Sequence, residues 1–209
     1  MGSRGEADWF AGLPIAQAAL AFASARHAGQ YREIDCAPFI THPIEVGRLL
    51  HRDGNPDHVI AAGLLHDVLE RTKTTRVELD RRFGASIGRL VGTVSDDPRI
   101  EDYDERKREL RERVERADHD TLAIFAADKI AKVGELMLLP PWRLHDGTTP
   151  AKLAHYHETL AMLHRVAGGV RLVDSLDACL ARLAALATAT APTRARRTRS
   201  TTTNRTHTS

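Results

Sequence analysis

The chain has 209 residues, of which 42% are hydrophobic and 28% are charged, so global disorder is excluded and one domain is favoured. Its two cysteines are too few for a disulfide framework and favour a reducing, cytoplasmic compartment. No apolar run approaches the ~20 residues of a membrane span, and the first residues lack the apolar stretch of a signal peptide. The net charge of +2 depends on five arginines after residue 187, so residues 1–187 carry a net charge of −3 and offer no basic surface for a nucleic-acid partner.

The first half of the chain predicts three helices. An Ala-rich segment of period 3.6 covers residues 14–27, and a second helix begins near Pro43 and ends before Gly54. Residues 56–71 follow as one helix, and its centre is apolar on every side. A helix without a polar face must be buried, so this segment is expected in the core.

The rest of the chain, after residue 71, is helical as well, and no alternating strand pattern of useful length occurs in it. The fold class is therefore all-α, and we expect a compact helical bundle. The remaining predicted helices are two short ones over residues 76–83 and 86–94, a charged one over 103–117, a second apolar one over 121–139, and two amphipathic ones over 150–167 and 170–187.

Residues 188–209 are rich in Thr and Arg and almost free of large apolar side chains. Such a segment cannot bury enough surface to offset the entropy of ordering, so we expect a disordered C-terminal tail. A basic tail can serve as an anion-binding arm, but charge runs are usually solvated extensions, and this second interpretation is preferred. The predicted organisation is thus one domain over residues 1–187 and a tail over 188–209.

His66 and Asp67 stand side by side near the C-terminal end of the predicted buried helix. A buried imidazole and a buried carboxylate lose their hydration, and a bound metal ion compensates for that loss. His42 lies at the predicted start of a helix, and Asp128 interrupts the second apolar helix. Two imidazoles with two carboxylates suit Mn²⁺, Fe²⁺ or Zn²⁺. Glu70, four residues beyond His66, can reach a metal-bound water without being a ligand.

A histidine by itself is more often a surface or hydrogen-bonded core residue than a metal ligand. The set formed by His42, His66 and the two aspartates is more specific because its members lie at apolar helices. The other histidines lack this setting. His27 ends a helix, where a cation suits the helix dipole, and the histidines at positions 155, 157 and 164 are expected to be solvated.

Several blocks of the sequence carry a resemblance to a known family. They keep their order over residues 15–180, and together they resemble the HD-domain alarmone hydrolases, which comprise the hydrolase half of the RelA/SpoT enzymes and small stand-alone relatives. The blocks are AFASARHAGQYR (residues 21–32), PFITHPIEVGRLL (38–50), AAGLLHDVLERTKTT (61–75), FGASIGRLVGTVSDD (83–97), ERKREL (105–110) and ADKI (127–130).

The resemblance implies a compact all-α HD domain that removes the 3′-pyrophosphate of (p)ppGpp with Mn²⁺ and yields GDP or GTP, as in the bacterial stringent response. A small-molecule nucleotide is then the partner, with no nucleic acid and no membrane. The implied metal ligands are His42, His66, Asp67 and Asp128. The resemblance implies Glu70 as the catalytic residue, and we name Asp67 and Arg71 as further candidate catalytic residues. It implies Arg32 beside the nucleotide base and Lys107, Lys152 and Tyr156 as other substrate-binding residues, and Lys132 is a further candidate.

Three positions differ from the family pattern: Glu33 replaces a cation, Arg71 replaces an acid and Lys132 replaces an asparagine. Arg71 can grip a phosphate or pair with Glu33, and we form the hypothesis that the charges at 33 and 71 were exchanged together. Two alternatives to alarmone hydrolysis stay open. One is an HD-domain phosphohydrolase for another nucleotide or phosphorylated metabolite, and the other is an inactive, metal-bearing regulatory module.

Overall fold

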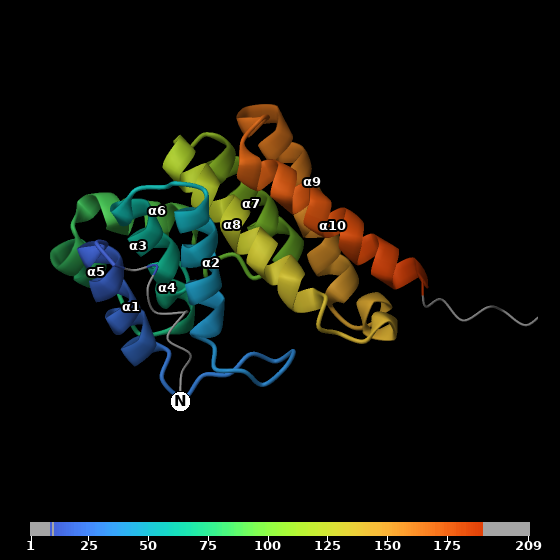
Figure 1. Cartoon of the computed structure of the whole chain (residues 1–209), viewed down its shortest axis with the longest axis horizontal. Coiled ribbons are helices and arrows are strands. Elements are labelled where there is room, and N and C mark those ends of the chain that lie inside the picture. Colours follow the sequence, from blue (N-terminus) through green and yellow to red (C-terminus); the bar gives the residue numbers. More distant parts are fainter. Residues whose placement is uncertain (1–8, 10, 190–209) are drawn as a thin grey trace, which may run out of the picture.

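The computed structural model describes residue 9 and residues 11–189. Within these residues the elements are helices, and extended backbone pairs at a single isolated bridge between Tyr31 and Pro38 (Figure 1). The predicted all-α class is confirmed. No helix in the described part of the chain is long and apolar enough to cross a membrane.

The helices follow the predicted order closely. Their bounds are α1 (Pro14–Arg26), α2 (Thr41–Arg52), α3 (Asp57–Leu65), α4 (Val68–Arg71), α5 (Arg76–Phe83), α6 (Ala85–Val94), α7 (Tyr103–Glu115), α8 (His119–Leu136), the short 3₁₀ helix η2 (Pro141–His145), α9 (Thr149–Ala167) and α10 (Arg171–Ala189).

The single helix predicted over residues 56–71 is wrong in one respect, because α3 and α4 are separated by a turn at His66 and Asp67. The His66 N–H lies 3.5 Å from the carbonyl oxygen of Gly63, so regular helical hydrogen bonding ends there. Consecutive side chains on a regular helix diverge by about 100°. The turn lets two neighbouring side chains reach the same buried point.

α10 extends to Ala189, two residues past the predicted domain boundary. The predicted disordered tail lies, from residue 190 onward, outside the described residues.

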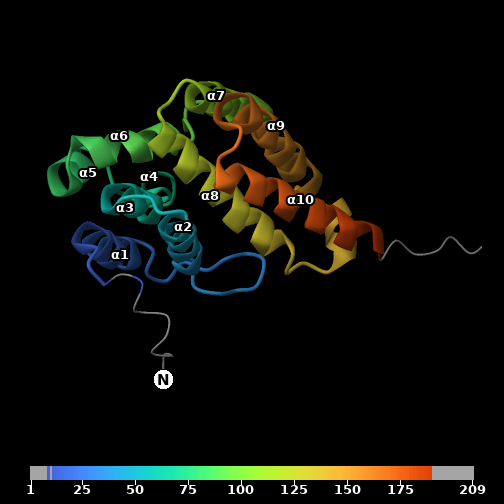
Figure 2. The ribbon, with the colours of Figure 1, turned by 45° about the horizontal axis from the view of Figure 1, so that its top comes forward.

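Two apolar helices, α3 and α8, form the centre of the molecule. α3 packs against α1, α2, α6 and α8, and its residues from Val59 to Leu65 are all buried. α8 packs against α2, α6, α7, α9 and α10, and it runs through the middle of the bundle in both ribbon views (Figures 1 and 2). The apolar centres predicted for these two helices account for this arrangement, because neither has a face that could meet water.

A close approach of α2 and α3 brings two of the candidate ligands together. A Cβ atom on Gly63 would lie 2.4 Å from Leu50 Cδ1, and one on Gly47 would lie 3.0 Å from the side chain of Leu64. A larger residue at either position would require the facing leucine to shift. The two glycines allow the helix that carries His42 to pack tightly against the helix that ends at His66.

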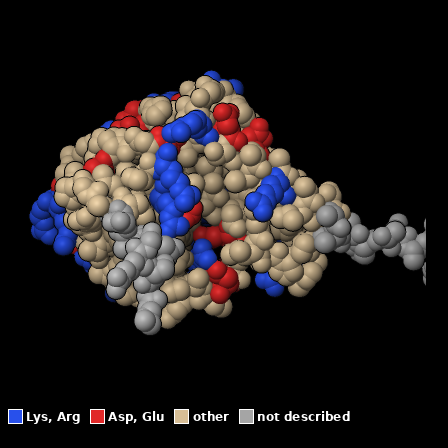
Figure 3. Space-filling model, in the orientation of Figure 1, with Lys and Arg blue, Asp and Glu red and all other residues tan. Residues whose placement is uncertain are grey.

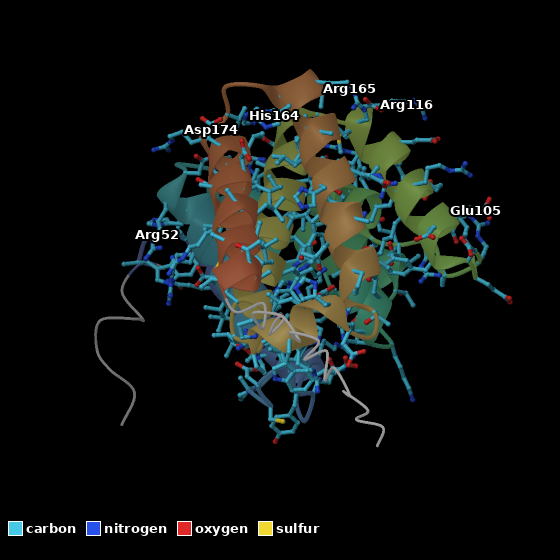
Figure 4. The ribbon with its side chains drawn as sticks, turned by 90° about the vertical axis from the view of Figure 1, so that its right-hand side faces the viewer. Arg52, Glu105, Arg116, His164, Arg165 and Asp174 are labelled. Atoms are coloured by element: carbon cyan, nitrogen blue, oxygen red, sulfur yellow. The ribbon has the colours of Figure 1, made fainter. Side chains whose placement is uncertain are left out.

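Charged side chains on the outer helix faces are solvated or form exposed ion pairs. Figure 4 shows Arg52, Glu105 and Arg165 on the outside of the bundle. Arg165 lies 2.8 Å from Glu115, an exposed pair of the kind that contributes little to stability. The charged groups that matter for chemistry lie in the interior, between α2, α4, α8 and α9.

Candidate active site

Four side chains converge on one buried point between α2, the α3–α4 turn and α8. His42 Nε2 lies 3.2 Å from His66 Nε2, and both nitrogens contact Asp128 Oδ1, at 3.1 and 3.3 Å. Asp67 Oδ2 lies 3.3 Å from His66 Nε2 and 3.6 Å from His42 Nε2. All four residues are at most 5% exposed. The structure thus brings together every residue that the sequence analysis names as a metal ligand.

The second ring nitrogen of each histidine fixes its orientation. His66 Nδ1 lies 2.8 Å from the carbonyl oxygen of Gly63, and His42 Nδ1 lies 2.8 Å from Glu135 Oε1. Each Nδ1–H therefore donates to an oxygen, which leaves Nε2 of both rings facing the shared point. This arrangement is typical of metal-binding histidines, whose other nitrogen donates to a carbonyl or carboxylate.

The residues fit a divalent cation with nitrogen and oxygen ligands. Ligand atoms ~2.1 Å from a tetrahedral metal ion are ~3.4 Å apart. The ligand atoms of His42, His66 and Asp128, 3.1 to 3.3 Å apart, form such a group. Asp67 Oδ2 lies beside this group, is buried and has no hydrogen-bond partner among the described residues, so a bound cation would compensate its charge. Burial alone would lower the pKa of His66, but Asp67 and Asp128 outweigh burial and raise it to about 10. The two carboxylates thus favour a positive charge at this point.

Two lysines of α8 contact Asp128, and one of them reaches the oxygen that faces the two histidines. Lys129 Nζ lies 2.6 Å from Asp128 Oδ2, and Lys132 Nζ lies 2.9 Å from Asp128 Oδ1. Burial alone would raise the pKa of Asp128, but these two cations hold it well below its usual value. Burial lowers the pKa of Lys129 to about 8, although Asp128 opposes the shift. Asp128 is therefore ionised and fixed in orientation.

A cavity of about 340 Å³ opens beside this cluster. Asp67 and Glu70 lie in its wall, together with the half-exposed side chain of Arg71. The other wall residues include all of the substrate-binding residues named from the sequence: Arg32, Lys107, Lys132, Lys152 and Tyr156. The wall carries six Lys and Arg side chains and five Asp and Glu side chains, so a divalent cation at the cluster would make the cavity suit an anionic ligand.

Glu70 lies in α4, beyond the turn, and points into the cavity. Its Oε1 accepts a hydrogen bond of 2.8 Å from the backbone N–H of Asp96. Desolvation by the surrounding protein and the charge of Asp67 raise the pKa of Glu70 above its usual value. A carboxylate with a raised pKa is a better proton acceptor at neutral pH, which suits a general base.

Arg71 stacks on an aromatic ring instead of pairing with Glu33. Its Cζ lies 4.4 Å from the centre of the Phe39 ring, and its Nε lies 3.8 Å from Asp67 Oδ2. Glu33 is exposed, and no ion pair joins it to Arg71 in the described part of the chain. The structural pair expected between positions 33 and 71 is therefore not formed.

Arg32 is held by two carboxylates. Its Nε donates to Asp35 Oδ1 at 3.0 Å, its Nη2 also contacts Asp35, and its Nη1 lies 3.3 Å from Glu135 Oε1. Asp35 belongs to the segment 33–37, which folds back so that Arg32 N–H donates to the carbonyl oxygen of Ala37. The guanidinium thus reaches the cavity with most of its donors already used.

α7 and α9 supply two lysines and a tyrosine hydroxyl to the cavity wall. Lys107 forms an ion pair of 2.6 Å with Asp96 at the cavity wall. Tyr156 is buried, and burial raises the pKa of its hydroxyl, which stays protonated and able to donate. Lys152 lies one turn before Tyr156 on α9 and lines the same cavity.

A profile of the HD domain family matches residues 19–131. The chain belongs to the HD-domain alarmone hydrolase family. It is 34% identical over 140 residues to the guanosine-3′,5′-bis(diphosphate) 3′-pyrophosphohydrolase MESH1 of Danio rerio. The aligned region covers 66% of this chain and 75% of that protein. It is also 34% identical over 145 residues to the enzyme of the same name from Homo sapiens, and that aligned region covers 68% of this chain and 78% of the relative.

Two solved structures are similar to this HD-domain fold. A metazoan ortholog of SpoT that hydrolyzes ppGpp matches with a TM-score of 0.72 and 24% identity, over 82% of this chain and 96% of that one. A protein of Listeria monocytogenes EGD-e matches with a TM-score of 0.61 and 23% identity, over 70% of this chain and 95% of that one. At these identities, the likeness supports the fold alone.

Two histidines of this HD domain are buried, although the sequence predicted one to be solvated and the other to be a helix-end cation. His155 was expected to be solvated, but it is 4% exposed and lies in the cavity wall, where Arg111 Nη1 donates to its Nδ1 at 2.7 Å. His27 was expected as a helix-end cation, but it is 2% exposed and burial lowers its pKa. In both cases the polar sequence neighbours hid a position that packing covers.

Sequence reasoning also missed Glu135, which binds the ring of His42. It lies on α8 seven residues after Asp128, so it is two turns along the same helix face. This spacing is the signal that could have revealed it, but a lone glutamate near a helix end is usually solvated, and nothing in the sequence pairs it with position 42.

Proposed function

We propose that this chain is a metal-dependent guanosine-3′,5′-bis(diphosphate) 3′-pyrophosphohydrolase that converts (p)ppGpp to GDP or GTP and pyrophosphate. The observation that carries the proposal is the convergence of His42, His66 and Asp128, with Asp67 beside them, at the edge of a cavity whose wall holds six lysines and arginines and five acids. The relatives named as enzymes of this activity, at 34% identity, support the same conclusion. A role in the stringent response and a cytoplasmic location belong to this proposal, and the cysteines, which are free, agree with a reducing compartment.

We assign Mn²⁺ or a similar divalent transition metal to the four-residue cluster of His42, His66, Asp67 and Asp128. Such an ion, when bound, neutralises phosphoryl oxygens and makes water more acidic. The two imidazoles act as neutral ligands through Nε2, because their Nδ1–H groups donate to Glu135 and to a backbone carbonyl. The two carboxylates balance the charge of the ion.

The chain's other cavity residues divide the remaining work. Glu70 holds the attacking water and accepts its proton, which its raised pKa favours. Lys107, Lys132 and Lys152 offset the charge that develops on the departing pyrophosphate. The protonated hydroxyl of Tyr156 donates a hydrogen bond to the substrate from the same side.

A direct test incubates the metal-loaded protein with ppGpp, pppGpp, GTP and ATP, each with Mn²⁺, and identifies the products by anion-exchange chromatography and phosphorus NMR. The expected result is GDP with pyrophosphate from ppGpp and GTP with pyrophosphate from pppGpp. The Glu70→Gln variant serves as the control for contaminating hydrolases. Release of phosphate or pyrophosphate from another nucleotide only, or no turnover of any, would contradict the proposal.

One observation favours a second candidate, a phosphohydrolase for another nucleotide or phosphorylated metabolite. Arg32, the implied contact to the base, has its guanidinium bound by Asp35 and Glu135. A substrate without guanine would not need this contact. The same product assay separates the two candidates, because only the second predicts turnover of a non-guanine substrate at a higher kcat/KM than ppGpp.

A further inference from the structure

The carboxylate of Glu135 joins a candidate metal ligand to a residue of the substrate cavity. Glu135 Oε1 lies 2.8 Å from His42 Nδ1 and 3.3 Å from Arg32 Nη1. The His42 side chain is 2% exposed, the Arg32 side chain 15% and the Glu135 side chain 17%. One oxygen therefore accepts from both groups, and the His42 ring at this contact is shielded from water.

The two histidines of the metal cluster are oriented by different means. His66 donates to a backbone carbonyl of its own helix, whose position the helix fixes. His42 donates to a side chain that comes from another helix, 93 residues further along the chain. A carboxylate at Nδ1 also makes the ring a stronger ligand, since it stabilises the positive charge that metal binding draws onto the imidazole.

A glutamate needs help to stay in one orientation, because its side chain has three rotatable bonds. Glu135 lies in the wall between the catalytic cavity and a second cavity of about 470 Å³ between α2, α8 and α10. Figure 3 shows the hollow between α2 and α10 on this face, with basic and acidic side chains near its edge. Glu135 is thus approached by solvent, and Arg32 is the cation that holds it against His42. Asp35 in turn holds Arg32.

We propose that Glu135 is a positioning residue for the metal ligand His42, and that Arg32 acts on metal affinity through Glu135. This inference rests on the proposed metal site, but it does not depend on which substrate is hydrolysed. The loop that carries Arg32 and Asp35 is thereby linked energetically to the metal ion, although neither residue touches the four ligand atoms. By thermodynamic reciprocity, a ligand that pulls Arg32 away from Glu135 weakens metal binding, and metal binding opposes that displacement.

The first test measures the Mn²⁺ dissociation constant of chelator-treated full-length protein by titration calorimetry and by the electron paramagnetic resonance signal of free Mn²⁺. Glu135→Ala should weaken Mn²⁺ binding by about 10- to 100-fold, the usual effect of removing such a partner. Glu135→Gln should weaken it less, because its amide oxygen still accepts the Nδ1–H of His42. The melting temperature of the metal-free variants should stay close to that of the wild type.

The matched control is Glu45→Ala. Glu45 lies on α2 three residues after His42, lines the same second cavity and pairs with Arg48, so it shares the charge and the surroundings but not the contact to the ring. Its Mn²⁺ affinity should equal that of the wild type. An affinity of Glu135→Ala within about twofold of the wild type would overturn the inference. If Glu135→Ala does not fold, an unchanged affinity of Glu135→Gln would overturn it instead.

A double-mutant cycle tests the role of Arg32. Arg32→Gln should weaken Mn²⁺ binding in the wild-type background and should have no further effect in the Glu135→Ala background, because its action passes through Glu135. An equal effect of Arg32→Gln in both backgrounds would overturn this part of the inference. Failure of the wild type to hydrolyse ppGpp would refute the proposed function. The Mn²⁺ affinities of the variants could still be measured, and they would still support or overturn the role of Glu135.

Discussion

At the metal-ligand end of the cavity, four side chains are each at most 7% exposed, whereas on the substrate-facing wall the side chain of Arg71 is 51% exposed. The ligand end is built from α2, the α3–α4 turn and α8, whose backbones are fixed by the core. The substrate-facing wall includes the loop before α2, where Arg32 and Phe39 lie. Substitutions in the wall away from Arg32 and Glu135 can therefore change the substrate while the metal ligands stay in place.

The two regions also differ in electrostatics. In the ligand end, Asp67 and Asp128 have pKa values well below the usual range, although burial alone would raise them, because histidines and lysines surround them. In the wall, Lys107 pairs with Asp96 and Arg71 stacks on Phe39. The buried carboxylates of the ligand end favour a bound cation, whereas the wall mixes cations with acids.

The largest effect is expected for His66→Ala. Loss of one of four ligands, and of the fixed Nε2 lone pair, should abolish stoichiometric Mn²⁺ binding. Added Mn²⁺ should raise the melting temperature of the wild type, because a ligand at 100 times its dissociation constant stabilises the native state by ~2.7 kcal/mol. It should not raise that of the variant. Elemental analysis and thermal melts check this. The control is His157→Ala, an exposed histidine of α9, and full metal occupancy in His66→Ala would contradict the assignment.

Glu70→Gln should keep the metal but lose turnover by ~10²–10⁴-fold, the usual contribution of a positioned acid–base group. The amide keeps the shape of the side chain and its acceptor towards the Asp96 N–H, but it cannot accept a proton. Single-turnover kinetics with measured metal content check this. Glu112→Gln, an exposed position on α7, is the control. Unchanged turnover would exclude Glu70 as the general base.

His155 should make stability depend on pH. Burial, with Lys129 and Lys107 nearby, lowers its pKa to about 2, so it stays neutral in the folded protein. The unfolded chain binds a proton at this residue below pH ~6.5, so the free energy of unfolding falls as the pH drops through that value, by up to ~1.4 kcal/mol per pH unit. His27, whose pKa is also lowered, acts in the same direction.

His155→Phe should flatten this pH dependence between pH 6.5 and 5 and leave the curves parallel above pH 7.5, whatever its effect on absolute stability. Urea unfolding at several pH values measures the slope. His157→Phe, at an exposed position two residues away, should keep the wild-type slope. An unchanged slope in His155→Phe would mean that the histidine is protonated in the folded protein.

The smallest effect is expected for the pair Glu33→Lys and Arg71→Asp. Because Arg71 contacts Phe39 and Asp67 rather than Glu33, the two substitutions should act additively on kcat/KM for ppGpp, within ~0.5 kcal/mol. A double-mutant cycle with the two single variants and the double variant measures the coupling. A coupling well above 1 kcal/mol would support the joint exchange of charges and would mean that the two side chains meet when substrate is bound.

The sequence predicted the helices and the four-residue cluster because both depend on local pattern. The apolar centres of α3 and α8 require burial wherever they pack, and a polar pair such as His66–Asp67 inside an apolar segment needs compensation whatever surrounds it. The family resemblance, which the comparisons confirm, added the order of the blocks. The break between α3 and α4 was not predicted, because sequence periodicity there continues through the turn.

Only the tertiary structure decided which residues surround the cluster. Glu135 meets His42 across 93 positions of sequence, and His155, on α9, is buried where α7 packs against its helix, which its own polar neighbours do not indicate. The same holds for Arg71, whose partner is an aromatic ring on a distant loop rather than the glutamate that charge complementarity suggested. Local patterns fix which side chains must be buried, but the partners of a buried or half-buried charge depend on helix packing, which brings together residues that have no common signal in the sequence.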